Sequence, residues 1–171
     1  RPPEDLIDLN PYQTVTTLVD RDVVVYDPGI ICEYLDERFP HPGLGSSDPG
    51  ARAQARVALR RIEHDWYAVA DALEPGAGVD RRERERARKL LTESILASEP
   101  LFRLRPWFLS EQFSQLDAAV APILWRLPRW EFDVESLTAS APAIERYCVR
   151  VFARPSFLRS LSEAEAAMRG R

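Results

Sequence analysis

Strand-forming residues in this chain are confined to one short stretch, and this restricts its possible folds more than any other feature. Residues 15–19 and 23–26 are rich in valine and threonine, and Asp20-Arg21-Asp22 separates them. This pattern predicts a tight antiparallel hairpin. Because a lone hairpin is marginally stable in water and leaves unpaired edges, we expect further strands upstream or a partner chain that supplies them. The start at Arg1 rather than methionine is consistent with a fragment.

The remaining sequence has a helical pattern. Ser114 with Asp117, and Ser162 with Glu165, have the spacing of N-terminal capping boxes. Residues 43–50 are rich in glycine and serine, which is typical of a linker. Apolar residues at intervals of three and four predict helices over residues 30–38, 51–73, 81–97, 142–152 and 155–168, and another that begins at Ser114.

The apolar stripes of the two longest predicted helices define an expected core. We also expect Trp125 to be buried, since it lies in an apolar helix, and Trp130 to be partly exposed. The core positions expected on the two helices are Ala55, Leu59, Ile62, Trp66, Val69, Leu73, Ala87, Leu90, Leu91, Ile95 and Leu96.

Composition excludes several classes of function. Of 171 residues, 45% are hydrophobic and 29% are charged, as in ordinary globular proteins, and the formal net charge is −4. This charge gives no global attraction to nucleic acid or to anionic membranes. No apolar run reaches the length of a membrane span, and no signal peptide is visible. Cys32 and Cys148 form no spacing pattern, which favours a reducing compartment, so we expect a cytoplasmic protein.

The predicted helix over residues 30–38 ends at Pro40-His41-Pro42, which is the candidate docking site. A proline cannot continue a helix, and each proline pushes its predecessor toward extended geometry. The result is a stiff elbow that presents the His41 imidazole between two pyrrolidine rings. The alternative interpretation is that His41 caps the helix C-terminus, where a positive charge is favourable.

Other candidate residues carry weaker arguments. His64 lacks further ligands at metal-binding spacing, and no serine or cysteine has a recognisable histidine and acid order. Glu63, Asp65 and Tyr67 are expected in an interdomain groove or a dimer interface. The basic run over residues 81–89 could contact nucleic acid or an acidic surface, but a solvated helix face is the favoured interpretation.

Six segments occur in one order along nearly the whole chain. They are residues 3–11, 33–42, 61–67, 108–110, 121–128 and 150–154. Together with the hairpin and the helices, these segments resemble the glutathione S-transferase superfamily. Within it, they resemble the stringent starvation protein A family of bacterial RNA polymerase-associated proteins.

The resemblance implies an α+β, mostly helical fold. Residues 1–45 would form the remainder of a thioredoxin-like domain, and residues 46–171 an all-helical domain. It also implies a non-enzymatic, stress-response regulator of transcription that binds RNA polymerase holoenzyme, including its sigma factor, through Pro40, His41 and Pro42. No cofactor, metal, membrane contact or sequence-specific nucleic-acid binding is implied. The family fold is usually a dimer, so a homodimer or a heterodimer with a related chain is expected.

Three features of the sequence depart from the pattern of a catalytic glutathione transferase. The N-terminal region that carries the thiolate-stabilising hydroxyl or cysteine is absent. Thr16 stands where a cis-proline is expected, and a cis bond before a non-proline residue costs roughly 2.5–4 kcal/mol, so we expect a trans bond. Asp27-Pro28 replaces an acid-serine pair, and Pro28 has neither a hydroxyl nor a backbone donor. Glutathione chemistry is therefore disfavoured, although a divergent transferase and a structural dimerisation partner remain as alternatives.

Overall fold

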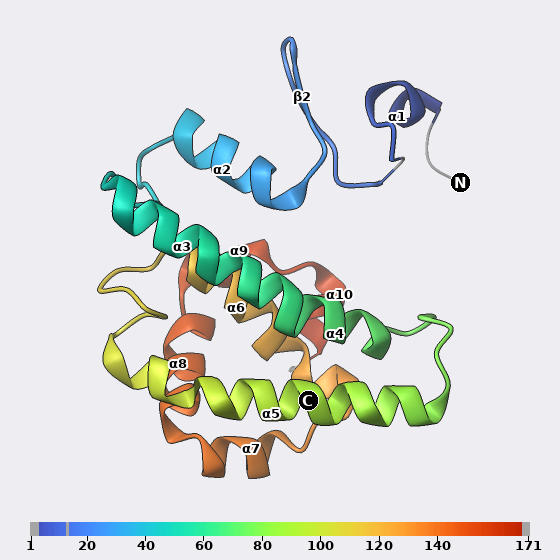
Figure 1. Cartoon of the computed structure of the whole chain (residues 1–171), viewed down its shortest axis with the longest axis vertical. Coiled ribbons are helices and arrows are strands. Elements are labelled where there is room, and N and C mark those ends of the chain that lie inside the picture. Colours follow the sequence, from blue (N-terminus) through green and yellow to red (C-terminus); the bar gives the residue numbers. More distant parts are fainter. Residues whose placement is uncertain (1–3, 13, 169–171) are drawn as a thin grey trace. The chain divides into compact units, whose positions relative to one another are not determined.

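The computed structural model describes residues 4–12 and 14–168, which divide into two compact units, residues 1–46 and 47–171 (Figure 1). The first unit contains α1 (Glu4–Leu9), β1 (Leu18–Asp20), β2 (Val23–Val25) and α2 (Pro28–Arg38). The two strands are antiparallel, with Leu18 opposite Val25 and Asp20 opposite Val23. The predicted hairpin is therefore present, but both of its strands are shorter than expected.

A buried asparagine explains the late start of β1. Asn10 is fully buried, and its Nδ2 donates to the carbonyl oxygen and Oγ1 of Thr14 (3.1 and 2.8 Å) and to Oγ1 of Thr17 (3.0 Å). Its Oδ1 accepts from the backbone N–H of Tyr12 (2.9 Å). These bonds hold Tyr12, Thr14 and Thr17 around one amide group, so the β-branched residues at 15–17 do not pair in the hairpin.

The second unit is helical in every element that the structure describes. Its central helix, α6, packs against α3 and α8, and α5 packs against α4 and α8 (Figure 1). The elements are α3 (Pro49–Ile62), η1 (Glu63–Tyr67), α4 (Ala68–Ala70), η2 (Asp71–Leu73), α5 (Arg81–Leu104), α6 (Gln115–Arg126), η3 (Leu127–Trp130), α7 (Val134–Ser140), α8 (Pro142–Phe152), α9 (Pro155–Ser160) and α10 (Glu163–Ala167).

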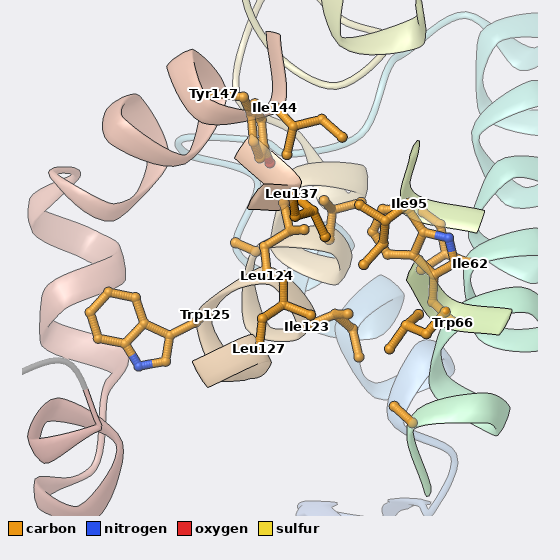
Figure 2. Close-up of a cluster of buried hydrophobic side chains, with 14 of the residues drawn as sticks. Ile62, Trp66, Ile95, Ile123, Leu124, Trp125, Leu127, Leu137, Ile144 and Tyr147 are labelled. Carbon is orange, nitrogen blue, oxygen red and sulfur yellow. The ribbon is translucent and has the colours of Figure 1, made fainter. Parts of the chain in front are cut away.

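One continuous apolar core holds this unit together. Figure 2 shows Ile123 and Leu124 of α6 amid side chains from the neighbouring helices, while Trp125 points the other way. Trp125 packs on Phe152 and Phe157, with ring centroids 4.9 and 5.2 Å apart. The α6 helix therefore has buried residues on nearly all sides, as expected for the centre of a bundle.

The helix predicted over residues 51–73 contains a wide π-type turn that sequence periodicity does not reveal. This turn is η1, and two side chains anchor it to neighbouring helices. Trp66 Nε1 donates to Ser94 Oγ (3.0 Å), and the Tyr67 hydroxyl donates to the Ala119 carbonyl (2.9 Å). The helical path then continues through α4 and ends in the 3₁₀ turn η2.

Two of the predicted helix boundaries were wrong. Helix α5 continues through Pro100 to Leu104, because Phe102 packs on Phe108 and Tyr147 (centroids 4.7 and 4.8 Å apart) and outweighs the missing proline N–H. The helix predicted over residues 155–168 breaks at Leu161 into α9 and α10. The break arises because Ser162 begins a new helix rather than lying inside one.

Two burial predictions were also wrong. Trp130 is only 3% exposed, since it ends η3 against α5, where Arg88 Nε donates to its carbonyl (3.0 Å). Leu90 is 45% exposed, because the buried positions of α5 run through Ala87 and Leu91, which leaves Leu90 off that face. No helix among the described residues is long and apolar enough to cross a membrane.

Both predicted capping boxes are confirmed. At the start of α6, the Asp117 carboxylate accepts from the backbone N–H groups of Ser114 (2.8 Å) and Phe108 (2.9 Å). Burial raises the pKa of Asp117, and these hydrogen bonds oppose the rise. At the start of α10, Glu165 accepts from the Ser162 N–H (3.1 Å) and from Arg126 Nη2 of α6 (2.6 Å). The second box therefore also ties α10 to the bundle.

Candidate functional site

The candidate docking site lies directly after α2, whose start is well capped. Asp27 is the N-cap residue, and its Oδ1 accepts from the Ile30 N–H (3.0 Å) while its carbonyl accepts from Ile31 (2.8 Å). Pro28 occupies the first helical turn, where its missing N–H costs nothing. Helix α2 therefore begins at Pro28, with Gly29 in its first turn.

The elbow begins where α2 ends, at the C-cap residue Phe39. The Phe39 N–H donates to the Leu35 carbonyl (2.9 Å), and the His41 N–H donates back to the Phe39 carbonyl (2.9 Å). The second bond closes a three-residue γ-turn centred on Pro40. The His41–Pro42 peptide bond is cis. Pro40, His41 and Pro42 are all exposed and form one continuous corner of the first unit.

The far side of the elbow is fixed by a carboxylate of α2. Asp36 Oδ1 accepts from the Leu44 N–H (2.6 Å), and its Oδ2 accepts from the Gly45 N–H (2.8 Å). A Cβ atom on Gly43 would lie 3.2 Å from the Pro40 carbonyl oxygen, so glycine permits the tight return of the chain. Both ends of the Pro40–Pro42 segment are thus tied to the same helix.

An apolar ring and a cation border the elbow. Phe39 is 61% exposed, and the Arg38 guanidinium lies over its ring, 5.3 Å from the centroid. Arg38 also approaches Asp20 (3.6 Å), whose carboxylate accepts from the Tyr34 hydroxyl (2.7 Å). This hydrogen bond is the main cause of the raised pKa of Tyr34. Because Asp20 is the last residue of β1, these contacts join the hairpin to α2.

The structure does not support the interpretation of His41 as a helix cap. Phe39 occupies the C-cap position, and Arg38 is the basic residue of the last turn. His41 lies two residues beyond the cap and is exposed. Its imidazole is therefore presented to solvent rather than used at the helix end.

The candidates at the end of α3 lie in and beside the π-type turn. Glu63 pairs with Arg60 (3.0 Å). The Tyr67 hydroxyl donates to the Ala119 carbonyl of α6, so Tyr67 packs within the helical unit. Within residues 4–12 and 14–168, no three histidine, cysteine or acidic side chains gather in a way that could hold a metal ion. In the basic run of α5, Arg81 pairs with Glu85 (2.8 Å), and Arg88 pairs with Glu131 (3.0 Å).

The positions that depart from the glutathione-binding pattern have other structural roles. The bond before Thr16 is trans, and Thr16 is exposed. Asp27, the remaining acid of the expected acid-serine pair, uses its carboxylate to cap α2. The stabilising role of Asp36 was missed by sequence reasoning, because its hydrogen bonds reach residues eight and nine positions further along the chain.

Comparison with known proteins first defines the class. Residues 57–155 match the family model "Glutathione S-transferase, C-terminal domain". The solved ternary complex of BphK, a bacterial glutathione S-transferase, has a TM-score of 0.80 and 19% sequence identity, and the match covers 95% of this chain and 80% of that chain. The fold is that of the glutathione S-transferase superfamily. This confirms the predicted fold class, a small thioredoxin-like part and a helical part.

Sequence relatives identify the family within this superfamily. The stringent starvation protein A homolog of Pasteurella multocida (strain Pm70) is 49% identical over 158 residues, which cover 92% of this chain and 72% of the relative. The homolog from Haemophilus influenzae is 47% identical over 162 residues, covering 95% of this chain and 74% of the relative. The chain belongs to the stringent starvation protein A family.

Proposed function

We propose that this chain is a non-catalytic, cytoplasmic regulator of transcription that binds RNA polymerase holoenzyme, including its sigma factor. The proposal combines membership of the stringent starvation protein A family with the geometry of the elbow. The observation that carries it is the Pro40-His41-Pro42 corner, which is exposed and held at both ends by α2. A surface that is already rigid loses little conformational entropy on binding.

The elbow has the chemistry of a protein contact rather than of an active site. It offers two pyrrolidine rings, the exposed Phe39 ring and one imidazole, with the Arg38 guanidinium at its border. Exposed aromatic and apolar groups beside an arginine are typical of residues that contribute most to binding in protein interfaces. Within this proposal, Asp36 is the residue that positions the corner.

The principal test is capture of RNA polymerase holoenzyme by the full chain. Replacement of Pro40, His41 and Pro42 together by alanine is expected to abolish capture, whereas Pro75→Ala, an exposed proline of the helical unit, is expected to leave it unchanged. Equal capture by the triple variant and the unaltered chain would refute the assigned surface. Circular dichroism of each variant checks that it is folded.

A second variant tests rigidity separately from contact chemistry. Asp36→Ala keeps all three elbow residues but frees the Leu44 and Gly45 amides, so hydrogen exchange at both amides should accelerate and polymerase capture should weaken. Glu37→Ala, which removes the neighbouring exposed carboxylate, should leave exchange at these two amides unchanged. If Asp36→Ala accelerates exchange without any loss of capture, rigid presentation of the corner is unnecessary.

The competing hypothesis is a divergent glutathione transferase, which the shared fold favours. Fold alone does not fix function. The trans bond before Thr16 and the use of Asp27 as a helix cap both argue against glutathione binding. Glutathione-dependent turnover of a chloronitrobenzene substrate by the full chain would favour the enzyme.

The family resemblance implies either a homodimer or a heterodimer with a related chain. Sedimentation of the chain alone, and mixed with a related chain, distinguishes these two assemblies.

A further inference from the structure

Helix α10, which follows the break at Leu161, is short and mostly exposed. It contains five residues, Glu163–Ala167, and within residues 162–167 every side chain except that of Glu165 is exposed. So short a helix is not stable in water by itself, because its few hydrogen bonds do not offset the cost of forming the first turn. Contacts with the rest of the helical unit must therefore hold α10 in place.

The polar contacts that hold α10 converge on Glu165. Its carbonyl oxygen accepts from Trp125 Nε1 (3.0 Å), and its Oε1 accepts from Arg126 Nη2 (2.6 Å). Its Oε2 accepts from the backbone N–H and the hydroxyl of Ser162 (3.1 and 2.9 Å). One residue thus joins the capping box of α10 to two successive residues of α6, so loss of its contacts should release the whole helix.

Apolar contacts add little to this attachment. Leu161 and Met168, on either side of α10, are only partly buried where they pack against the core. The backbone of Leu161 is extended (φ −71°, ψ 133°), so α9 and α10 are not one continuous helix. A segment with few buried apolar groups and with exposed backbone hydrogen bonds has a low free energy of local opening. Residues 162–168, called the strap below, fit this description.

The strap covers one edge of the Trp125 indole. Trp125 is only 8% exposed, and its ring packs on Phe152 and Phe157, whose own centroids are 5.3 Å apart. These two rings belong to α8 and α9 and do not move with the strap. When the strap leaves, Trp125 Nε1 loses its acceptor and the Arg126 guanidinium loses its carboxylate. Opening therefore changes the surface at two neighbouring residues of α6.

We propose that the strap opens as one unit at Leu161 while the rest of the helical unit stays folded, and that opening exposes the Trp125 indole N–H and the Arg126 guanidinium. Tryptophan and arginine are the residue types that contribute most often to binding in protein interfaces. The closed strap withholds both groups from solvent, so it is a reversible cover built into the fold. The cover lies in the second unit and does not depend on the proposed polymerase contact.

The test is hydrogen exchange of the full chain, followed by nuclear magnetic resonance. The Trp125 indole hydrogen and the Ala166 backbone N–H, which donates to the Ser162 carbonyl (2.9 Å), both require the strap to be closed. They should therefore exchange with one common free energy of opening. The backbone amides of Ile123 and Leu124 should be protected much more strongly, because α6 stays folded when the strap opens.

Two substitutions remove the contacts of Glu165 in different ways. Glu165→Ala should accelerate exchange of the indole hydrogen about tenfold. Arg126→Ala keeps the capping box and should also accelerate it, which a change in the stability of α10 alone would not explain. The matched control is Glu163→Ala, which removes an acid from the same helical turn and should change the rate less than about threefold.

Several outcomes would overturn the proposal. If the Trp125 indole hydrogen is as strongly protected as the amides of α6 while Ala166 exchanges rapidly, the strap frays without uncovering Trp125. Equal acceleration by Glu165→Ala and Glu163→Ala would mean that Glu165 does not fasten the strap. If Glu165→Ala accelerates exchange at Ile123 and Leu124 to the same extent, α10 is an integral part of the bundle rather than a separate opening unit.

Discussion

The two units of this chain are stabilised in different ways. In the first unit, Asn10 is the one buried residue among those whose burial is described. The structure of this unit depends instead on hydrogen bonds made by the side chains of Asn10, Asp20, Asp27 and Asp36. In the second, twenty-five hydrophobic residues form a continuous buried cluster. Hydrogen bonds contribute modest net stability and specify geometry, whereas apolar burial provides most of the driving force. The unit with the proposed docking elbow is therefore the one that depends on local polar contacts.

The largest difference between the two units is expected in the free energy of unfolding that is lost when one leucine of each is replaced by alanine. Leu124→Ala removes a fully buried side chain at the centre of α6 and should lower the free energy of unfolding by about 2–5 kcal/mol. Leu35→Ala, which truncates a residue of α2 that is already 39% exposed, should cost less than about 1 kcal/mol. Urea denaturation followed by circular dichroism measures both values. Equal costs would mean that the first unit also relies on apolar burial.

A smaller effect is expected at the buried capping box. Asp117→Ala leaves the N–H groups of Phe108 and Ser114 without their acceptor in a dry environment and should cost about 1–3 kcal/mol. Calorimetric melting measures the loss. Asp117→Asn retains an acceptor oxygen and should recover part of it. If Asp117→Ala left the stability unchanged, polar contacts would matter little in the second unit.

Asn10 is the corresponding test of the first unit. Asn10→Ala removes the bonds to Tyr12, Thr14 and Thr17, and the expected cost is about 1–3 kcal/mol. Because all of these partners lie in the first unit, the loss is expected there. Hydrogen exchange should accelerate at residues 12–25 and stay unchanged in α6. Acceleration throughout the chain would contradict a local role for these hydrogen bonds.

The smallest effect concerns pH at the edge of the second unit. Hydrogen bonds from the Ser162 backbone and from Arg126 lower the pKa of Glu165 below its ordinary value of 4.5. Its folded-state pKa is depressed, so its contribution is present above 4.5 and is lost as pH falls through the folded-state value. Hydrogen exchange of α10 should therefore accelerate in acid. In Glu165→Gln this acid dependence should be weaker, and an unchanged dependence would assign it to another group.

Sequence alone predicted the features that depend on neighbouring residues. Both capping boxes are of this kind, since Ser114 and Ser162 meet their partners three positions away. Trp130 and the π-type turn were not predictable, because both depend on contacts with helices distant in the sequence. The proline-flanked corner of the candidate site was evident, but its attachment to Asp36 depends on the path of the returning loop.

The distribution of aromatic residues gives the two units distinct optical properties. All four tryptophans, Trp66, Trp107, Trp125 and Trp130, lie in the second unit, whereas the aromatic residues of the first are tyrosines and Phe39. Emission excited selectively from tryptophan therefore originates in the helical unit. Unfolding of the hairpin and α2 has no tryptophan of its own to report it, so a tryptophan introduced into α2 would be needed to follow it.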